Sequence, residues 1–230
     1  MLMSREVEIK TRKLGVTFQD NEGNDVKVVI NNLTIMNSQG PALVSSDTEL
    51  VLNNVVFENC TADDERIVYI SESDNVVFNN CTFKSNSNAS DLYSDHSNIT
   101  VNHSVFLDGD DSDSCIEQNR GTLEINDCNF ENDPSKYGGI LNYKGNQMSV
   151  KNSNFSNSKA SITGGAIVAK YFPELVNDTT PVPSDAMVIE NCSFSHLSSR
   201  SNGGAIYMDM DSGSLYVPQT LNVVNCNFTN

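Results

Sequence analysis

Ile125-Asn126-Asp127-Cys128-Asn129-Phe130-Glu131-Asn132 decides the fold, because the same pattern recurs seven more times along the 230 residues. In this pattern a hydrophobic residue is followed two places later by an Asn-like residue, three places further on by Phe and usually two places after that by Asn. The other copies begin at Ile30, Leu52, Phe78, Val101, Val150, Ile189 and Val223. A unit this short cannot bury its own apolar face, so we expect the copies to stack as one solenoid.

The spacing within and between copies predicts the shape of each unit. The first five intervals are 22, 26, 23, 24 and 25 residues, and the last two are 39 and 34. Apolar residues alternate, as in Leu123-x-Ile125, skip one place at Asp127 and resume as Cys128-x-Phe130. Alternation with period two indicates strands, and the skipped place indicates a corner. A third strand is expected later in the unit, at 139–141, 165–167 and 204–206, and less clearly at 67–69 and 115–116.

Three short strands per repeat predict an all-β, single-stranded parallel β-helix, with about eight coils of 22–26 residues and two loop inserts. We expect residues 1–230 to form one domain. Stacked coils would align one aromatic column in the core and one polar column at the corner. The aromatic column is Ile35, Phe57, Phe83, Phe106, Phe130, Phe155, Phe194 and Phe228. The corner column is Asn32, Asn54, Asn80, His103, Asp127, Asn152, Asn191 and Asn225.

The corner column makes a specific prediction, because Asn and Asp tolerate left-handed backbone and their amides can bond the coils above and below. We expect these positions to be buried, and we interpret His103 as a ladder member in place of an amide. Among the Asn-x-Ser/Thr sequons, this leaves Asn88 and Asn177 as the ones expected to be accessible.

Four of the six cysteines share one column of the repeat: Cys81, Cys128, Cys192 and Cys226. Val55, Leu33, Ser104 and Ser153 fill the same column in the other copies, so Cys exchanges there with small or apolar residues, as a buried thiol would. The favoured interpretation is buried free thiols. A disulfide framework is the alternative, with Cys192 and Cys226 as its best pair because they lie in successive copies.

Composition restricts the class of protein. The formal net charge is −16, which disfavours partners that need a basic footprint, namely nucleic acid and anionic membranes. No apolar stretch approaches the roughly 18 residues of a membrane span, so we expect no membrane insertion by this segment. Residues 1–5 are not followed by an apolar segment, so no signal peptide is predicted, and if the protein is exported we expect this chain to be a mature piece or an internal fragment of it.

The repeat resembles those of the chlamydial polymorphic membrane proteins and of the adhesin-like surface proteins of methanogenic archaea. The resemblance rests on Phe83-Lys84-Ser85-Asn86 and on Gly-Gly-x-hydrophobic at 138–141, 164–167 and 203–206. It covers nearly the whole chain. It implies a right-handed, pectin-lyase-like β-helix that is extracellular, belongs to a longer surface protein and is continuous with further repeats. The implied partner is a glycan or protein on a host or neighbouring cell, and no cofactor is implied.

The two inserts, at 171–185 and 210–218, interrupt the repeat and are therefore the expected contact points. Within them we predict Tyr171, Phe172 and Tyr216 as ligand-binding residues.

A carbohydrate-active enzyme is the alternative function. The segment Gly109-Asp110-Asp111-Ser112-Asp113-Ser114-Cys115-Ile116 loosely resembles the acidic segment of polygalacturonases, in which paired carboxylates act on a glycosidic bond. It has three inserted residues, and the companion segments of that family are missing. Asp110 and Asp111 are thus catalytic candidates only under this alternative. No acidic cluster has the spacing of a Ca²⁺ loop, so no metal is expected.

Overall fold

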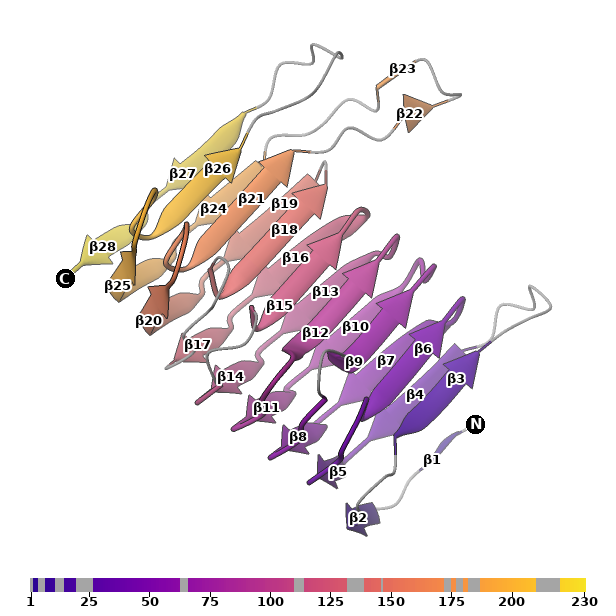
Figure 1. Cartoon of the computed structure of the whole chain (residues 1–230). Coiled ribbons are helices and arrows are strands. Elements are labelled where there is room, and N and C mark those ends of the chain that lie inside the picture. Colours follow the sequence, from indigo (N-terminus) through magenta and orange to yellow (C-terminus); the bar gives the residue numbers. More distant parts are fainter. Residues whose placement is uncertain are drawn as a thin grey trace.

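A computed structural model describes residues 2–3, 7–10, 15–19, 27–62, 66–109, 114–131, 139–145, 147–171, 175–176, 180–181, 187–209 and 220–230. Its body consists of three parallel sheets that run side by side along one axis (Figure 1). Each strand pairs in register with its counterparts in the preceding and following coils. This arrangement confirms the predicted parallel β-helix.

Sheet A contains β1 (Leu2–Met3), β4 (Lys27–Asn31), β7 (Glu49–Asn53), β10 (Val76–Asn79), β13 (Ile99–Asn102), β16 (Thr122–Asn126), β19 (Gln147–Lys151), β24 (Met187–Glu190) and β27 (Leu221–Val224). Sheet B contains β2 (Val7–Lys10), β5 (Leu33–Met36), β8 (Val56–Glu58), β11 (Thr82–Lys84), β14 (Val105–Leu107), β17 (Asn129–Glu131), β20 (Asn154–Ala160), β25 (Ser193–Ser199) and β28 (Asn227–Thr229). Sheet C contains β3 (Val16–Gln19), β6 (Leu43–Ser46), β9 (Arg66–Ser71), β12 (Ser90–Asp95), β15 (Ile116–Asn119), β18 (Leu141–Gly145), β21 (Ile167–Tyr171) and β26 (Ile206–Asp209).

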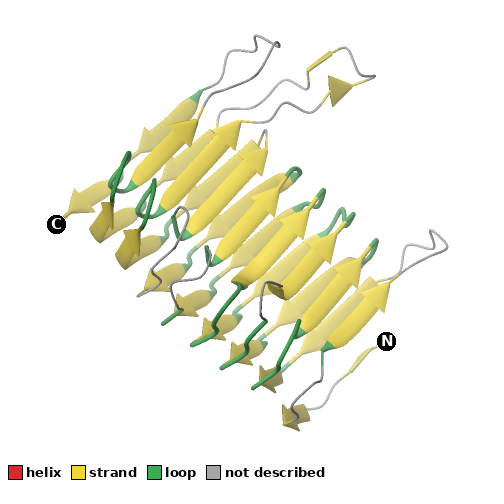
Figure 2. Ribbon diagram, in the orientation of Figure 1, coloured by secondary structure: helices red, strands yellow, loops and turns green. Residues whose placement is uncertain are grey.

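Sheets A and B have nine strands each, one more than the eight predicted coils. The additional coil holds β1, β2 and β3 and precedes the first recognised copy. It lacks the Phe and corner Asn of the repeat, but Ile9 lies in register with Ile35 below the aromatic column. Neighbouring strands lie about 4.8 Å apart, so the eight spacings of sheet A extend over roughly 38 Å. Figure 2 shows only strands and loops in the described residues, where no helix could span a membrane.

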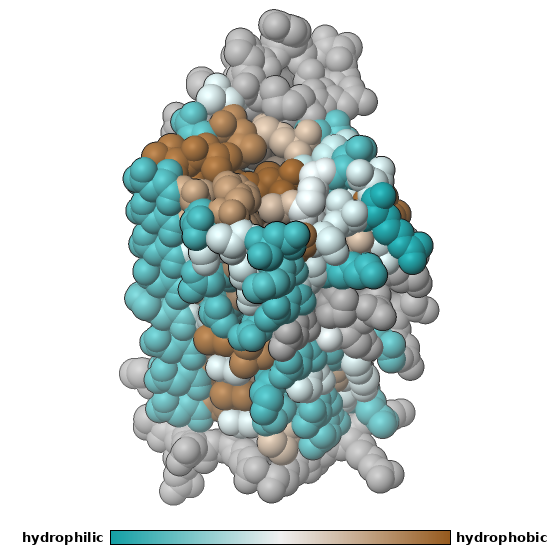
Figure 3. All heavy atoms as spheres, turned by 90° about the vertical axis from the view of Figure 1, so that its left-hand side faces the viewer, coloured by the Kyte–Doolittle hydropathy of each residue, from teal (hydrophilic) through white to brown (hydrophobic). Residues whose placement is uncertain are grey.

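The predicted aromatic column forms the centre of the core. Phe106 and Phe130 have ring centroids 4.8 Å apart, Phe130 and Phe155 are 4.7 Å apart, and the rings of these pairs are nearly parallel. The stack runs without a break from Phe57 to Phe228. Phe130 is fully buried, whereas Phe228 in the last coil is 50% exposed. Figure 3 looks onto this end of the rod, where hydrophobic residues gather inside hydrophilic sides.

The first corner, between sheets A and B, has the predicted backbone. All eight residues of the predicted corner column have left-handed φ values between 50° and 55°. The expectation that they are buried is wrong, because every one of them is exposed. Their amides form only two bonds along the axis, Asn54 to Asn32 at 3.0 Å and Asn191 to Asn152 at 3.3 Å.

The continuous amide ladder lies one residue earlier, at the ends of the sheet A strands. Its members are Asn31, Asn53, Asn79, Asn102 and Asn126. The Nδ2 of each of the last four donates to the Oδ1 of the Asn in the preceding coil, at 2.8–3.1 Å. A strand position keeps equivalent side chains in register and partly buried, whereas the corner turns its side chain outward. The predicted ladder of Asn side chains therefore exists, but it lies one residue before the predicted positions.

All six cysteines are free thiols, and all of them except Cys226 in the last coil are buried, as the favoured interpretation predicted. Cys and Ser exchange in the shared column because both side chains donate to the backbone carbonyl two residues earlier. Cys81 Sγ donates to the carbonyl of Asn79 at 3.6 Å, and Ser104 Oγ donates to the equivalent carbonyl of Asn102 at 2.9 Å. Burial raises the pKa of the Cys81 and Cys128 thiols to about 11.

The first predicted insert contains structure that the sequence did not suggest. Within it, β22 (Leu175–Val176) and β23 (Thr180–Pro181) form a short antiparallel pair, visible beside the body in Figure 1. The second predicted insert, at 210–218, lies outside the described residues.

Candidate functional site

The third corner, between sheets C and A, carries Glu and Arg, which do not occur at positive φ in the described residues of the other two corners. Glu72, His96 and Arg120 occupy it in three successive coils, with φ values of 50°, 48° and 65°. The left-handed conformation costs roughly 1–2 kcal/mol per residue for such side chains, and Asn or Asp accepts it more readily. Several unfavourable residues at one place are a sign of a functional constraint.

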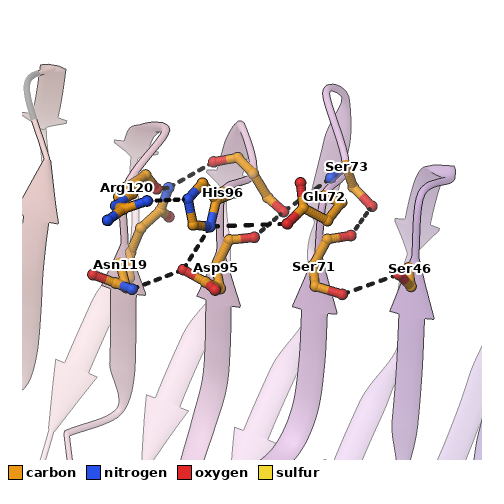
Figure 4. A network of polar contacts seen from close by, with 10 residues as sticks. Ser46, Ser71, Glu72, Ser73, Asp95, His96, Asn119 and Arg120 are labelled. Atoms are coloured by element: carbon orange, nitrogen blue, oxygen red, sulfur yellow. Dashed lines mark hydrogen bonds and ion pairs between the residues drawn. The ribbon is translucent and has the colours of Figure 1, made fainter. Parts of the chain in front are cut away.

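Glu72, Asp95, His96, Asn119 and Arg120 form a connected group that we call the corner cluster (Figure 4). His96 Nδ1 lies 3.0 Å from Asp95 Oδ1 and 3.9 Å from Glu72 Oε1. His96 Nε2 contacts Nη1 of Arg120. A guanidinium group can only donate, so Nε2 accepts this bond and the proton of a neutral His96 is assigned to Nδ1, where it is donated to Asp95.

The corner cluster continues along the strand ends of sheet C as a polar column. Ser71 Oγ donates to Ser46 Oγ at 3.1 Å, and Asn119 Nδ2 donates to Asp95 Oδ1 at 2.7 Å (Figure 4). In register beyond Asn119 the column continues with Lys144, Lys170 and Asp209. This column links seven successive strands, from β6 to β26.

A tyrosine pair lies beside this column on the same outward face. Tyr69 and Tyr93, two residues before Ser71 and Asp95, stack with ring centroids 5.5 Å apart and an interplanar angle of 6°. The Arg66 guanidinium lies 4.7 Å from the Tyr93 ring centroid and 3.5 Å from a Glu117 carboxylate oxygen. Burial, followed by the charges of Asp95 and Glu117, raises the pKa of Tyr93. Its hydroxyl therefore remains a hydrogen-bond donor at neutral pH.

Together, the corner cluster and the tyrosine pair present many hydrogen-bonding groups to solvent. The side chain of His96 is 38% exposed and that of Glu72 is 66% exposed. Donors and acceptors both occur on β9, β12 and β15, a mixture suited to a ligand with many hydroxyl groups. Within the described ranges, no group of three His, Cys, Asp or Glu side chains has the geometry of a metal site.

The functional residues predicted from the sequence lie either outside the corner cluster or outside the described ranges. Tyr171 is the last residue of β21 in sheet C. Phe172, Tyr216, Asp110, Asp111 and the sequon Asn177 lie outside the described residues. His103 is a corner residue, 64% exposed and 3.8 Å from Asp127. It is therefore not the buried ladder member that was predicted, and Asn102, one residue earlier, holds that place. The other predicted accessible sequon, Asn88, is exposed, but the corner sequons Asn32, Asn80 and Asn191 are exposed as well, so the restriction of accessible sequons to Asn88 and Asn177 is wrong.

The sequence did carry a weak signal for the missed face. Tyr69-Ile70-Ser71 and Tyr93-Ser94-Asp95 lie one repeat apart and share the same spacing of aromatic and polar residues.

Comparison with known proteins identifies the family. Residues 5–155 match the family described as the right-handed β-helix region. The chain belongs to the right-handed β-helix family. The match indicates that the coils formed by sheets A, B and C wind in the right-handed sense. The matched residues include the whole corner cluster. Searches of curated proteins and of solved structures returned no match. The family therefore establishes the fold, and the function must be argued from the surface of this β-helix.

Proposed function

We propose that this β-helix is a non-enzymatic, adhesin-like module at the cell surface that mediates attachment or acts as a stalk. The observation that carries the proposal is the bonding of polar side chains along the rod axis. In sheet A, the amide ladder joins five successive coils, and in sheet C the Ser and Asn side chains of neighbouring coils are bonded in the same way.

Axial bonding is what a mechanical rod requires, because force applied along the axis would separate coil from coil. The surface pairs Lys27–Glu49 and Lys84–Glu58, both at 3.3 Å, also join successive coils. The net charge of −16 favours solubility and disfavours non-specific association with other acidic surfaces. Attachment would then be left to a specific face.

The face that best supports attachment is the part of sheet C around the corner cluster and the tyrosine pair. Its mixture of carboxylate, amide, imidazole, guanidinium and phenol groups suits a glycan or a polar protein surface on a host or neighbouring cell. The predicted contact residue Tyr171 ends a strand of the same sheet, and the first insert follows directly.

A bead assay tests the proposal. Beads coated with the purified chain should be retained on cells or on their isolated surface glycans, and soluble chain should compete with them. The double variant Tyr69→Ala/Tyr93→Ala should reduce retention, whereas Val51→Ala/Val77→Ala on the outward face of sheet A should not. A pure stalk predicts no retention by any variant, and retention that is equal for coated and bare beads would refute attachment.

A carbohydrate-active enzyme remains the second candidate, because Asp95 and Glu72 both approach His96 Nδ1 at an exposed sheet edge. Carboxylates at a sugar-accessible face are the groups that glycosidases use. Release of reducing ends from acidic or neutral polysaccharides, with loss of this activity in Asp95→Asn or Asp111→Asn, would favour the enzyme over the attachment module.

A further inference from the structure

Cys192 and Cys226 are the two members of the cysteine column that lie in successive coils. Ser193 and Asn227, the residues that follow them, pair in register, and the backbone N–H of Asn227 donates to the carbonyl of Cys192 at 2.9 Å. Neighbouring coils are about 4.8 Å apart, and a disulfide spans a Cα separation of roughly 4.4–6.8 Å. The backbone therefore holds the two cysteines within reach of a covalent bond.

The two thiols also point in the same direction. Cys192 Sγ donates to the carbonyl of Glu190 at 3.2 Å, and Cys226 Sγ donates to that of Val224 at 3.3 Å. Glu190 and Val224 are partners in register, so the two sulfur atoms lie one above the other along the rod axis. Burial, and to a smaller extent the neighbouring Cys226 thiol, raises the pKa of Cys192 to about 11. The thiols are therefore direct neighbours.

A cysteine at position 226 departs from the rest of the column, in which a serine lies one coil after each cysteine. Ser104 Oγ accepts a hydrogen bond from the backbone N–H of Cys81 at 3.0 Å, and Ser153 Oγ accepts one from that of Cys128 at 3.1 Å. A thiol is a weaker acceptor than a hydroxyl group. Support of the preceding backbone therefore favours serine at position 226, whereas a covalent bond to the preceding coil requires cysteine.

We propose that Cys192 and Cys226 form an oxidation site, at which a small-molecule disulfide converts the two thiols into a disulfide bond between coils. Cys226 is partly exposed and Cys192 is buried, so the Cys226 thiolate attacks one sulfur of the small disulfide, forms a mixed disulfide and releases one small thiolate. The Cys192 thiolate then attacks the Cys226 sulfur and releases the second small thiolate. The two protons lost by the cysteines convert both small thiolates to thiols, so two cysteines are oxidised and one small disulfide is reduced.

The bond would fasten the coil of β27 and β28 to the coil of β24 and β25. It would close residues 193–225 into a loop that contains the predicted insert at 210–218. Bond formation draws the sulfur atoms from about the coil spacing of 4.8 Å to about 2.0 Å and away from the carbonyls that they contact. Strained disulfides are the easily reduced ones, so we expect a reversible link. This inference does not depend on the proposed attachment function.

Incubation of the folded chain with oxidised glutathione, followed by unfolding, alkylation of the remaining thiols and mass spectrometry, tests the proposal. The oxidised wild type should lose two hydrogen atoms and keep four of its six cysteines open to alkylation. Proteolytic digestion should yield one linked pair of peptides, which contain Cys192 and Cys226. Dithiothreitol should restore all six thiols. The link should form faster as the pH rises toward 11, because a larger share of the Cys192 thiol is then ionised.

The same column supplies the matched control. Cys81 and Cys128 lie two coils apart, a separation of about 9.6 Å that a disulfide cannot span. The variant Cys81→Ser/Cys128→Ser should therefore form the link with less than a twofold change in rate. Cys226→Ser introduces the residue type that follows the other cysteines of the column, so it should keep the circular dichroism of the wild type and form no link. Six alkylated cysteines in the oxidised wild type, a glutathione adduct that never resolves into the link, or the same loss of two thiols in Cys226→Ser would overturn the proposal.

Discussion

Truncation of one ring in the aromatic column tests the physical basis of the fold. Phe130 is fully buried and stacks on Phe106 at 4.8 Å and on Phe155 at 4.7 Å. Phe130→Ala removes a core side chain and both stacking contacts. Large-to-small substitutions of this kind cost about 3–5 kcal/mol, and we expect the upper half of this range because coils held on both sides cannot collapse into the cavity.

The matched control is Phe228→Ala, in the last coil of the same column. Phe228 is 50% exposed and stacks on one ring only, Phe194 at 4.8 Å, so its loss should cost about 1–2 kcal/mol. Urea unfolding followed by circular dichroism measures both values. A loss below 1 kcal/mol for Phe130→Ala, or equal losses for the two variants, would refute a core built on this stack.

Three further predictions follow from the polar ladders, the corners and the thiols. Asn79→Ala removes the bonds to Asn53 and Asn102 and should lower the free energy of unfolding by about 1–3 kcal/mol, as measured by urea unfolding; an unchanged midpoint would contradict the ladder's role. Ser85→Gly should raise the free energy of unfolding by about 0.5–1 kcal/mol, because Ser85 has φ of 52°, whereas the same change at Ser87, which has no positive φ, should lower it. The pKa values of Cys81 and Cys128 are raised to about 11 from 9.0, so the folded state holds these protons longer than the unfolded state and stability should fall as pH rises from 9 to 11. Cys81→Ala/Cys128→Ala should flatten this pH dependence in thermal melts, and an equally steep loss in the variant would assign it to other groups.

The sequence predicted the elements that repeat in residue type as well as in position. Phe130 and its equivalents are nearly invariant within the chain, so the column could be identified directly. The left-handed corner was also predictable, because Asn and Asp dominate it. The ladder was displaced to Asn53 and its equivalents because two successive Asn columns, such as Asn53-Asn54, are adjacent in the repeat. Which of the two columns forms the ladder depends on which one ends the strand and which one occupies the corner, and the sequence does not show this.

The corner cluster could not be predicted in the same way. Glu72, His96 and Arg120 share a backbone position but no chemical type, so no pattern joins them. Their relation depends on where the third corner falls, and the repeat does not mark that corner with a common residue. The additional first coil was not predicted for a similar reason, because it lacks the Phe and Asn by which the other copies of the repeat were recognised.

The measurement that bears most directly on attachment is the retention of chain-coated beads on intact cells under flow, with the same surface glycans assayed for released fragments. The proposed function predicts retention that soluble chain abolishes, with no release of reducing ends. Beads that wash off like uncoated ones, or the appearance of cleaved glycan, would contradict a non-enzymatic attachment module.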